Sequence, residues 1–157
     1  MLVLGIDPGS MITGYGLVEK KEGHISCVDA GIISSPQNSP FYDRIHNIFR
    51  SIVEIMHRYK PLEMAIEDVF FAKNVKSSLK LGHARGAALI AAVDCGVKVF
   101  EYTPLEIKKS VVGYGRATKE QICSMVQIIL KHPKRFGPDT SDALAAAICH
   151  LNWTRYK

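Results

Sequence analysis

Residues 2–10 constrain the fold more than any other stretch of this chain. Residues 2–6 form an almost unbroken apolar run, which favours a strand buried on both faces, as central strands of α/β sheets are. Asp7 lies where that strand ends, and Pro8 and Gly9 fit the second and third positions of a type II turn. Taken alone, the segment favours ordinary turn chemistry, and a functional role for Asp7 requires partners elsewhere in the chain.

Further strands and a helix are predicted next. Residues 13–20 and 25–33 are expected to complete a three-stranded meander with the first strand. Ser39 predicts a helix cap, and apolar residues at helical spacing then continue as far as residue 59. Residues 62–66 suit a fourth strand. A helix between two strands implies a parallel crossover connection.

A second carboxylate, Glu67, follows the fourth predicted strand. If the first and fourth strands are parallel neighbours, Asp7 and Glu67 emerge at the same edge of the sheet. That edge, at the carboxyl ends of the strands, is where open α/β sheets place their sites.

The second half of the chain predicts helices around one more strand. We expect a helix over residues 78–93, a strand over 98–102, a short helix from Thr103-Pro104, and helices over 119–130 and 137–150. The first of these helices has a smooth face that includes Gly82 and Gly86. That face serves either internal packing or self-association.

The last predicted helix carries Asp139 and Asp142, at positions i and i+3 on one face, with Cβ atoms about 5–6 Å apart. Acidic residues in a first turn also interact favourably with the helix dipole, and alone they are more often dipole partners than ligands. Four carboxylates that meet at one point cannot all stay ionised without a cation, and oxygen ligands without His or Cys select Mg²⁺ or Mn²⁺. Two such ions about 4 Å apart would serve phosphodiester hydrolysis.

Two segments combine basic residues with features that suit nucleic acid. Phe70 and Phe71 lie beside Lys73 and Lys76, so that a ring can stack on a base while the lysines meet phosphate, or both rings can cap the core. Residues 108–119 place glycines beside a tyrosine and four basic residues, which are Lys108, Lys109, Arg116 and Lys119. We favour phosphate contact for this run over a plain inter-helix loop.

Composition limits the class of protein. The 157 residues suit a single domain that buries roughly two-thirds of its unfolded surface. Lys and Arg number 20 against 15 Asp and Glu, and the net charge of +5 is compatible with a polyanionic partner. The four cysteines include no C-x-x-C pair, which favours reduced thiols. The apolar N-terminal run has no basic leader, and no apolar run approaches the roughly 20 residues of a membrane span, so we expect a cytoplasmic protein without a membrane partner.

Five motifs, in order along nearly the whole chain, together resemble the RuvC family of Holliday junction resolvases. They are GIDPG at 5–9, AIE at 65–67 with VF at 69–70 and AKN at 72–74, KLGHARG at 80–86, the run 108–119, and DTSDALA at 139–145. The resemblance implies one RNase H-like α/β domain over residues 1–157, with a five-stranded mixed sheet in the order 3-2-1-4-5 flanked by helices.

The resemblance also implies a function and a set of site residues. It implies a homodimer that makes paired Mg²⁺-dependent nicks in four-way DNA junctions during recombination and repair, with Mn²⁺ able to replace Mg²⁺, and it suggests a complex with a branch-migration helicase. It implies that four residues bind metal and act in catalysis: Asp7, Glu67, Asp139 and Asp142. Phe70 would contact the junction, and Lys108 and Lys119 would lie near the scissile phosphate. We add Lys73 and Arg116 as DNA contacts, and we assign no role to Asp68 or Phe71.

Three rival functions remain. An ATPase of the actin or sugar-kinase type also ends its first strand in an acidic, glycine-containing turn, but it needs two lobes where 157 residues supply one domain. A junction-binding module without catalysis would not need the acidic set. A small RNase H-like ribonuclease would be favoured by cleavage of linear RNA.

Overall fold

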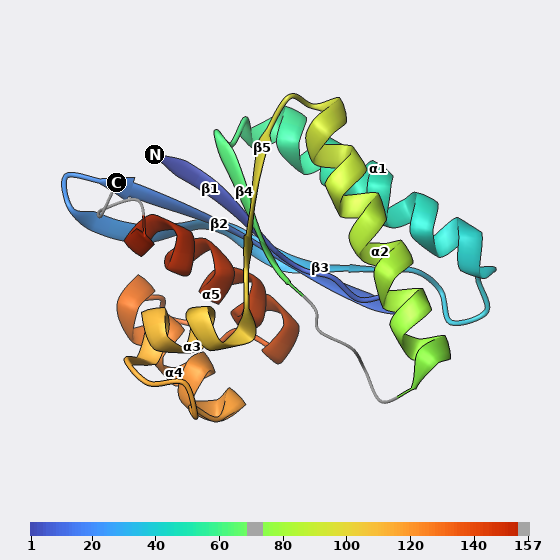
Figure 1. Cartoon of the computed structure of the whole chain (residues 1–157). Helices are drawn as coiled ribbons and strands as arrows, with labels where there is room; N and C mark the ends of the chain where they lie inside the picture. Colours follow the sequence, from blue (N-terminus) through green and yellow to red (C-terminus); the bar gives the residue numbers. More distant parts are fainter. Residues whose placement is uncertain (69–73, 154–157) are drawn as a thin grey trace.

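The computed structural model describes residues 1–68 and 74–153. Five strands form one mixed sheet in the order β3-β2-β1-β4-β5 (Figure 1). The strands are β1 (Leu2–Asp7), β2 (Ile12–Lys21), β3 (His24–Ser34), β4 (Glu63–Glu67) and β5 (Lys98–Tyr102). β1, β2 and β3 pair antiparallel, whereas β4 is parallel to both β1 and β5. The predicted meander, the parallel crossover and the strand order are confirmed.

Helices cover both faces of this sheet (Figure 1). They are α1 (Phe41–Tyr59), α2 (Val75–Asp94), α3 (Pro104–Val112), α4 (Lys119–Leu130) and α5 (Pro138–Trp153). α1 and α2 pack together on one face, and α5 crosses β1 and β2 on the other, with α3 and α4 packed against it. Among the described residues, no helix is both long and apolar enough to cross a membrane.

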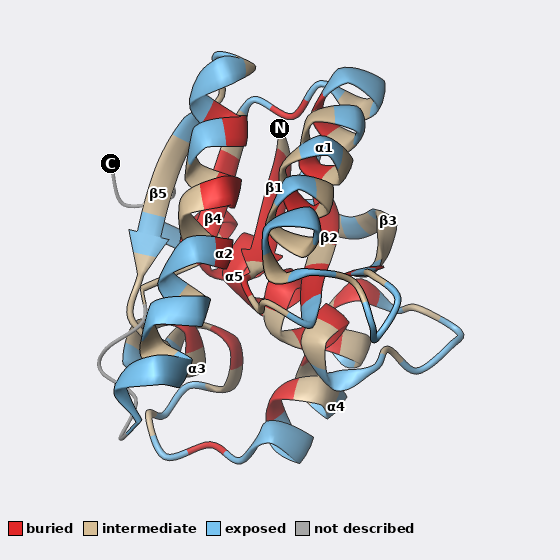
Figure 2. Cartoon of the chain, turned by 90° about the vertical axis from the view of Figure 1, so that its right-hand side faces the viewer, coloured by how far each residue is buried: buried red, intermediate tan, exposed pale blue. Residues whose placement is uncertain are grey.

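Alternation along the central strands divides the core into two layers. Leu4 and Ile6 of β1 pack with α1 and α2, whereas Val3 packs with α5. In β4, Met64 and Ile66 face α1 and α2, and Ala65 faces α5. Successive side chains in a strand point to opposite faces. Figure 2 shows the result as buried central strands and buried inner faces on the covering helices.

Four local predictions need correction. The N-cap of α1 is Pro40, without a side-chain cap, rather than Ser39. α2 begins three residues before the predicted start, because the side chain of Asn74 accepts a hydrogen bond from the Ser77 amide. The first part of the basic run is helical, since α3 continues to Val112. The turn after Asp7 is not type II, because among described glycines only Gly23, Gly96 and Gly113 have positive φ.

Gly9 is required because the Ile12 backbone passes close to it, and its φ is not positive. A Cβ at Gly9 would lie 2.2 Å from the carbonyl oxygen of Ile12, well inside contact distance. The hydroxyl of buried Thr13 donates to the Gly9 carbonyl at 2.8 Å and accepts from the Gly9 amide at 3.3 Å. The turn therefore folds back on the start of β2, and this contact fixes the chain directly after Asp7.

Candidate active site

The parallel register brings two carboxylates to one edge and one face of the sheet. Ile6 of β1 pairs with Ile66 of β4, so Asp7 and Glu67 occupy the next position on each strand. Asp7 and Glu67 are two residues after Gly5 and Ala65, which face α5, so all four positions lie on the same face of the sheet. Asp7 and Glu67 thus end neighbouring strands beneath the first turns of α5.

Two glycines let α5 approach the sheet closely. A Cβ at Gly5 would lie 1.9 Å from the carbonyl oxygen of Ala143, and a Cβ at Gly14 would lie 2.1 Å from that of Asp139. The hydroxyl of Thr140 also donates to the Gly31 carbonyl on β3 at 3.2 Å. The first turns of α5, which carry Asp139 and Asp142, are therefore held against the strands that end near Asp7.

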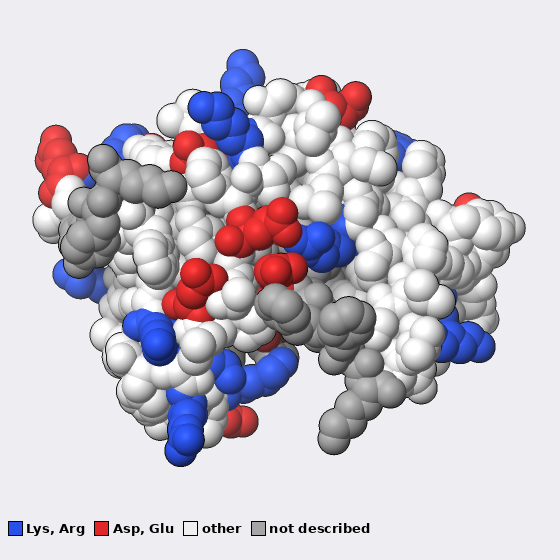
Figure 3. Space-filling view, viewed as in Figure 1, with Lys and Arg blue, Asp and Glu red and all other residues white. Residues whose placement is uncertain are grey.

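The electrostatics of Asp7 reflect this proximity. Burial, followed by the negative charges of Asp142, Glu67 and Asp139, raises the pKa of the Asp7 carboxyl from 3.8 to about 7, and the charge of Lys119 opposes this rise. Burial also raises the pKa of Glu67, with Asp142 adding to the effect. The four predicted acidic residues therefore belong to one electrostatic cluster. Figure 3 shows that acidic side chains gather near the centre of one face of the molecule, with basic side chains beside them.

A lysine supplies counter-charge inside this cluster. The ammonium of Lys119 lies 3.4 Å from the Asp142 carboxylate. The charge of Asp142 is the largest cause of the raised pKa of Lys119, and Asp7 and Asp139 add to it. Burial raises the pKa of Asp142, while Lys119 pulls it down. Lys119 begins α4, where Thr118 and Gln121 form a capping box that fixes its backbone.

Lys108 enters the same site from α3. A pocket of about 160 Å³ is lined by residues of β4, α3, α4 and α5, which are Glu67, Pro104, Ile107, Lys108, Lys119, Ile122 and Asp142. α3 starts in a second capping box, in which the Thr103 hydroxyl accepts from the Glu106 amide at 3.2 Å and the Glu106 carboxylate accepts from the Thr103 amide at 2.8 Å. The hydrogen bonds from Thr103 hold the pKa of Glu106 below its ordinary value.

The donor set suits a hard divalent cation, although the side chains are not yet gathered around one point. Within residues 1–68 and 74–153, no three His, Cys, Asp or Glu side chains lie close enough together to hold an ion as they stand. The cluster nonetheless holds only carboxylate oxygens as ligands, which suit Mg²⁺ or Mn²⁺ rather than a soft metal. Its raised pKa values indicate excess negative charge, which a cation would relieve more fully than Lys119 does.

Three further DNA contacts are predicted from the sequence: Arg116, Phe70 and Lys73. Arg116 lies in the loop between α3 and α4. Phe70 and Lys73 lie outside the described residues, so their predicted DNA contacts stay predictions.

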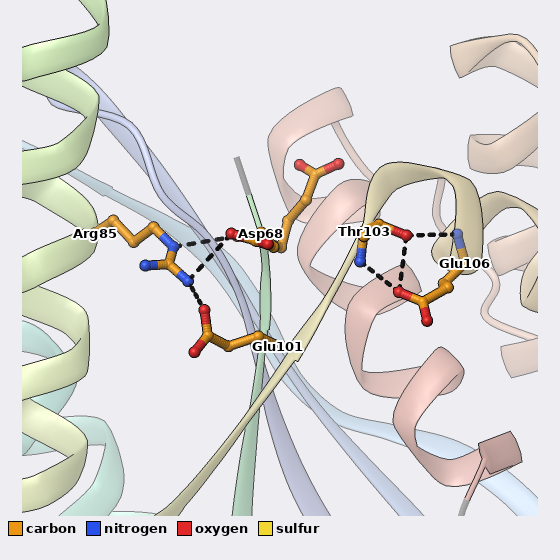
Figure 4. A network of polar contacts seen from close by, with 6 residues as sticks. Asp68, Arg85, Glu101, Thr103 and Glu106 are labelled. Atoms are coloured by element: carbon orange, nitrogen blue, oxygen red, sulfur yellow. Dashed lines mark hydrogen bonds and ion pairs between the residues drawn. The ribbon is translucent and has the colours of Figure 1, made fainter. Parts of the chain in front are cut away.

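Sequence reasoning missed one group beside the cluster. Arg85 of α2 forms ion pairs with Asp68, at 3.7 Å, and with Glu101 of β5. Figure 4 shows its guanidinium reaching from α2 toward both carboxylates, beside the end of β4. The segment KLGHARG contains the only hint of this group in the sequence, and it indicates nothing about which way Arg85 points.

A mixed sheet in this order, with carboxylates at the ends of β1 and β4 and on the helix that crosses them, defines the RNase H-like class of metal-dependent nucleases. A family model described as "Crossover junction endodeoxyribonuclease RuvC" matches residues 3–150. The chain belongs to this family.

Similar proteins agree over nearly the whole chain. Crossover junction endodeoxyribonuclease RuvC from Geobacter metallireducens is 50% identical over 152 residues, which cover 97% of this chain and 93% of that protein. The structure of T. thermophilus RuvC in complex with Holliday junction substrate matches with a TM-score of 0.93 at 34% identity, over 99% of this chain and 96% of that one. A further Thermus thermophilus RuvC structure matches with a TM-score of 0.88 at 33% identity, with the same coverage. The RNase H-like fold and the family resemblance are both confirmed.

Proposed function

We propose that this chain, as one nuclease domain over residues 1–157, resolves four-way DNA junctions by paired Mg²⁺-dependent nicks in recombination and repair. One observation carries the proposal: Asp7, Glu67, Asp139 and Asp142 act on one another electrostatically at the carboxyl edge of the sheet. A junction-binding module would not require such a cluster. Family membership supplies the class of reaction, and the similar T. thermophilus RuvC is in complex with a Holliday junction, the same kind of substrate.

The four carboxylates would hold Mg²⁺, with two ions per site and Mn²⁺ as an alternative. When bound, the ions would activate water and stabilise the leaving oxygen of the phosphodiester. Asp7 has the central position, because its pKa responds to all three of the other acids. Metal binding requires the ionised carboxylate, so protons and metal compete for Asp7 near neutral pH.

The basic residues would orient the phosphate. Lys119 and Lys108 line the same pocket as Glu67 and Asp142, so they can reach a phosphate that the metal also contacts. Arg116 lies farther along the loop and would meet the DNA backbone. We propose the same for Lys73, with Phe70 stacking on an unpaired base near the crossover.

A substrate panel tests the reaction class. Synthetic four-way junction, linear duplex, linear RNA and ATP are each incubated with the chain, with and without Mg²⁺. The proposal predicts symmetric nicks in the junction alone, and only with the metal. Preferential cutting of linear RNA would favour a ribonuclease instead, and ATP hydrolysis would favour the actin-like alternative.

We further propose a homodimer formed through α1 and α2, since two symmetric cuts require two sites related by a two-fold axis. A groove of about 680 Å³ runs between these helices, and it is lined by Tyr42, Ile45, His46, Phe49, Ser78, Leu79, Gly82, His83, Gly86, Ala87 and Ile90. A Cβ at Gly82 or Gly86 would meet no atom within 4 Å, so another helix can approach closely there. Tyr42 and Ile90 are 73% and 63% exposed, which leaves apolar surface for a second copy to bury.

The substitution Ile90→Asp tests the dimer. We expect it to yield a monomer in light scattering and to abolish paired cutting, whereas Ile128→Asp, on an exposed residue of α4, should remain dimeric. A dimeric Ile90→Asp variant would place the interface elsewhere.

The proposal also includes a cytoplasmic location and a branch-migration helicase as a partner on the same junction. Co-purification on junction DNA would test the helicase partner.

A further inference from the structure

Arg85 occupies an unusual position for a basic side chain on a covering helix. Only 19% of its side chain is exposed, although α2 lies at the surface. Its guanidinium faces three acceptors: the Glu101 carboxylate, the Asp68 carboxylate at 3.7 Å, and the backbone carbonyl of Glu67, which lies 3.5 Å from Nε. A largely desolvated guanidinium with several acceptors in a fixed fork is a strong geometric restraint.

These contacts surround the point where β4 ends. Beyond Glu67, the amide of Asp68 donates to the Tyr102 carbonyl at 2.7 Å, which extends the pairing with β5 by one residue. Arg85 restrains the same point from α2, on the face of the sheet opposite α5. It contacts Asp68, the Glu67 carbonyl and Glu101 of β5 at once. Figure 4 shows this arrangement, with Arg85 reaching from α2 to the ends of both strands.

The Glu67 side chain points the other way, toward α5 and the acidic cluster. Its pKa responds to Asp142, Lys119 and Lys108, which lie on α5, α4 and α3 respectively. Arg85 therefore holds the backbone of Glu67 from one face of the sheet while the carboxylate acts on the other. Because side chains alternate across a strand, a fixed backbone direction at Glu67 fixes where its carboxylate points.

We propose that Arg85 is a positioning residue that fixes the Glu67 carboxylate for metal binding and cleavage. The inference rests on the proposed function for its link to cleavage, but its link to metal binding can be measured separately. α2 also lines the proposed dimer groove through Gly82 and Gly86, which flank Arg85 in sequence. The same helix thus connects the groove to a carboxylate of the active site.

The test compares Arg85→Met and Arg85→Lys with wild type. The control is Arg50→Met, which removes an exposed arginine whose partner is Glu54, one turn away on α1. One readout is the rise in melting temperature caused by Mn²⁺, which reports metal binding without cleavage. The other is the Mg²⁺ dependence of junction cleavage, with kcat and KM determined separately.

We expect Arg85→Met to lower kcat by about 10- to 100-fold, as a small misplacement of a catalytic group does, with KM for the junction changed less than about twofold. The Mg²⁺ midpoint should rise and the Mn²⁺-induced melting shift should shrink. Arg85→Lys should recover part of both effects, and Arg50→Met should match wild type. In a Glu67→Gln background, Arg85→Met should cause no further loss of the Mn²⁺ shift, because the two residues act through one group.

Two results would overturn the inference. One is an Arg85→Met variant, folded at the assay temperature, with an unchanged Mn²⁺ shift. The other is a loss of the Mn²⁺ shift that is fully additive with the loss caused by Glu67→Gln, which would mean that Arg85 acts through a group other than Glu67. If wild type binds Mn²⁺ but fails to cut the junction, the proposed function fails, while the melting shifts still decide the role of Arg85.

Discussion

Gly14 offers a direct test of how α5 delivers its two aspartates. In Gly14→Ala, the new Cβ would lie 2.1 Å from the carbonyl oxygen of Asp139 and 2.5 Å from its carbonyl carbon. Ordinary contact begins at 3.4 Å, so the first turn of α5 must move by about 1.3 Å, the difference between 3.4 and 2.1 Å. Both neighbours are backbone atoms, and no side chain can rotate to relieve the clash.

The magnitude follows from two separate effects. Overpacking of this kind costs about 1–3 kcal/mol of unfolding free energy. For a chain of this size, that corresponds to a fall in melting temperature of roughly 2–12 °C. The displacement also moves Asp139 relative to Asp7, and a 1 Å misplacement near the reacting groups costs about 100-fold in rate. Catalysis should therefore suffer much more than folding does.

The assay is single-turnover cleavage of a four-way junction in Mg²⁺, at a temperature at which circular dichroism shows both proteins fully folded. Gly137→Ala is the matched control, because a Cβ at Gly137 meets no atom within 4 Å although the residue directly precedes α5. The control should cut at the wild-type rate. A folded Gly14→Ala variant that also cuts at that rate would refute the idea that close packing of α5 on β2 sets the geometry of the site.

Two further predictions concern the single residues Asp7 and Phe70. The pKa of Asp7 is about 7 in the folded chain, against an ordinary value of 3.8. Between these two pH values the folded chain holds a proton that the unfolded chain has released, so the free energy of unfolding, measured in EDTA, should fall as pH rises from about 4 to about 7. Asp7→Asn should remove this loss and melt higher than wild type at pH 8 but not at pH 4, and equal melting at both would contradict the raised pKa. Phe70→Ala should lose junction cleavage while keeping its melting temperature, and a large fall in that temperature would instead indicate that the ring belongs to the core.

Much of the fold follows from local patterns in the sequence. The apolar run of β1 predicts a buried central strand, and the helix between β3 and β4 predicts the parallel crossover. Together these bring Asp7 and Glu67 to one edge. That both carboxylates also share a face with α5 depends on register, since Gly5 must pair with Ala65, and no local pattern specifies that pairing.

What could not be predicted depends on contacts between distant segments. Gly14 stands in β2 without any sign that a helix far along the chain will need its space. Gly9 fits a type II turn by composition, yet its role is to avoid the Ile12 carbonyl. Gly82 and Gly86 could have faced inward with Ala87 and Ala91, and only the rotation of α2 about its axis turns them toward open space. The direction of the Arg85 side chain depends on the same rotation of α2, so the sequence could not predict its contacts with Asp68 and Glu101.

The most direct test of the central claim is the substitution Asp7→Asn, measured for both cleavage and binding of a synthetic four-way junction. The variant keeps the size of the side chain but removes the charge that the site would use to hold the metal. We predict that cleavage in Mg²⁺ is abolished while structure-specific binding, measured by gel shift, stays largely intact. Cutting at the wild-type rate would contradict the assignment of Asp7 and its three acidic neighbours as the catalytic metal site.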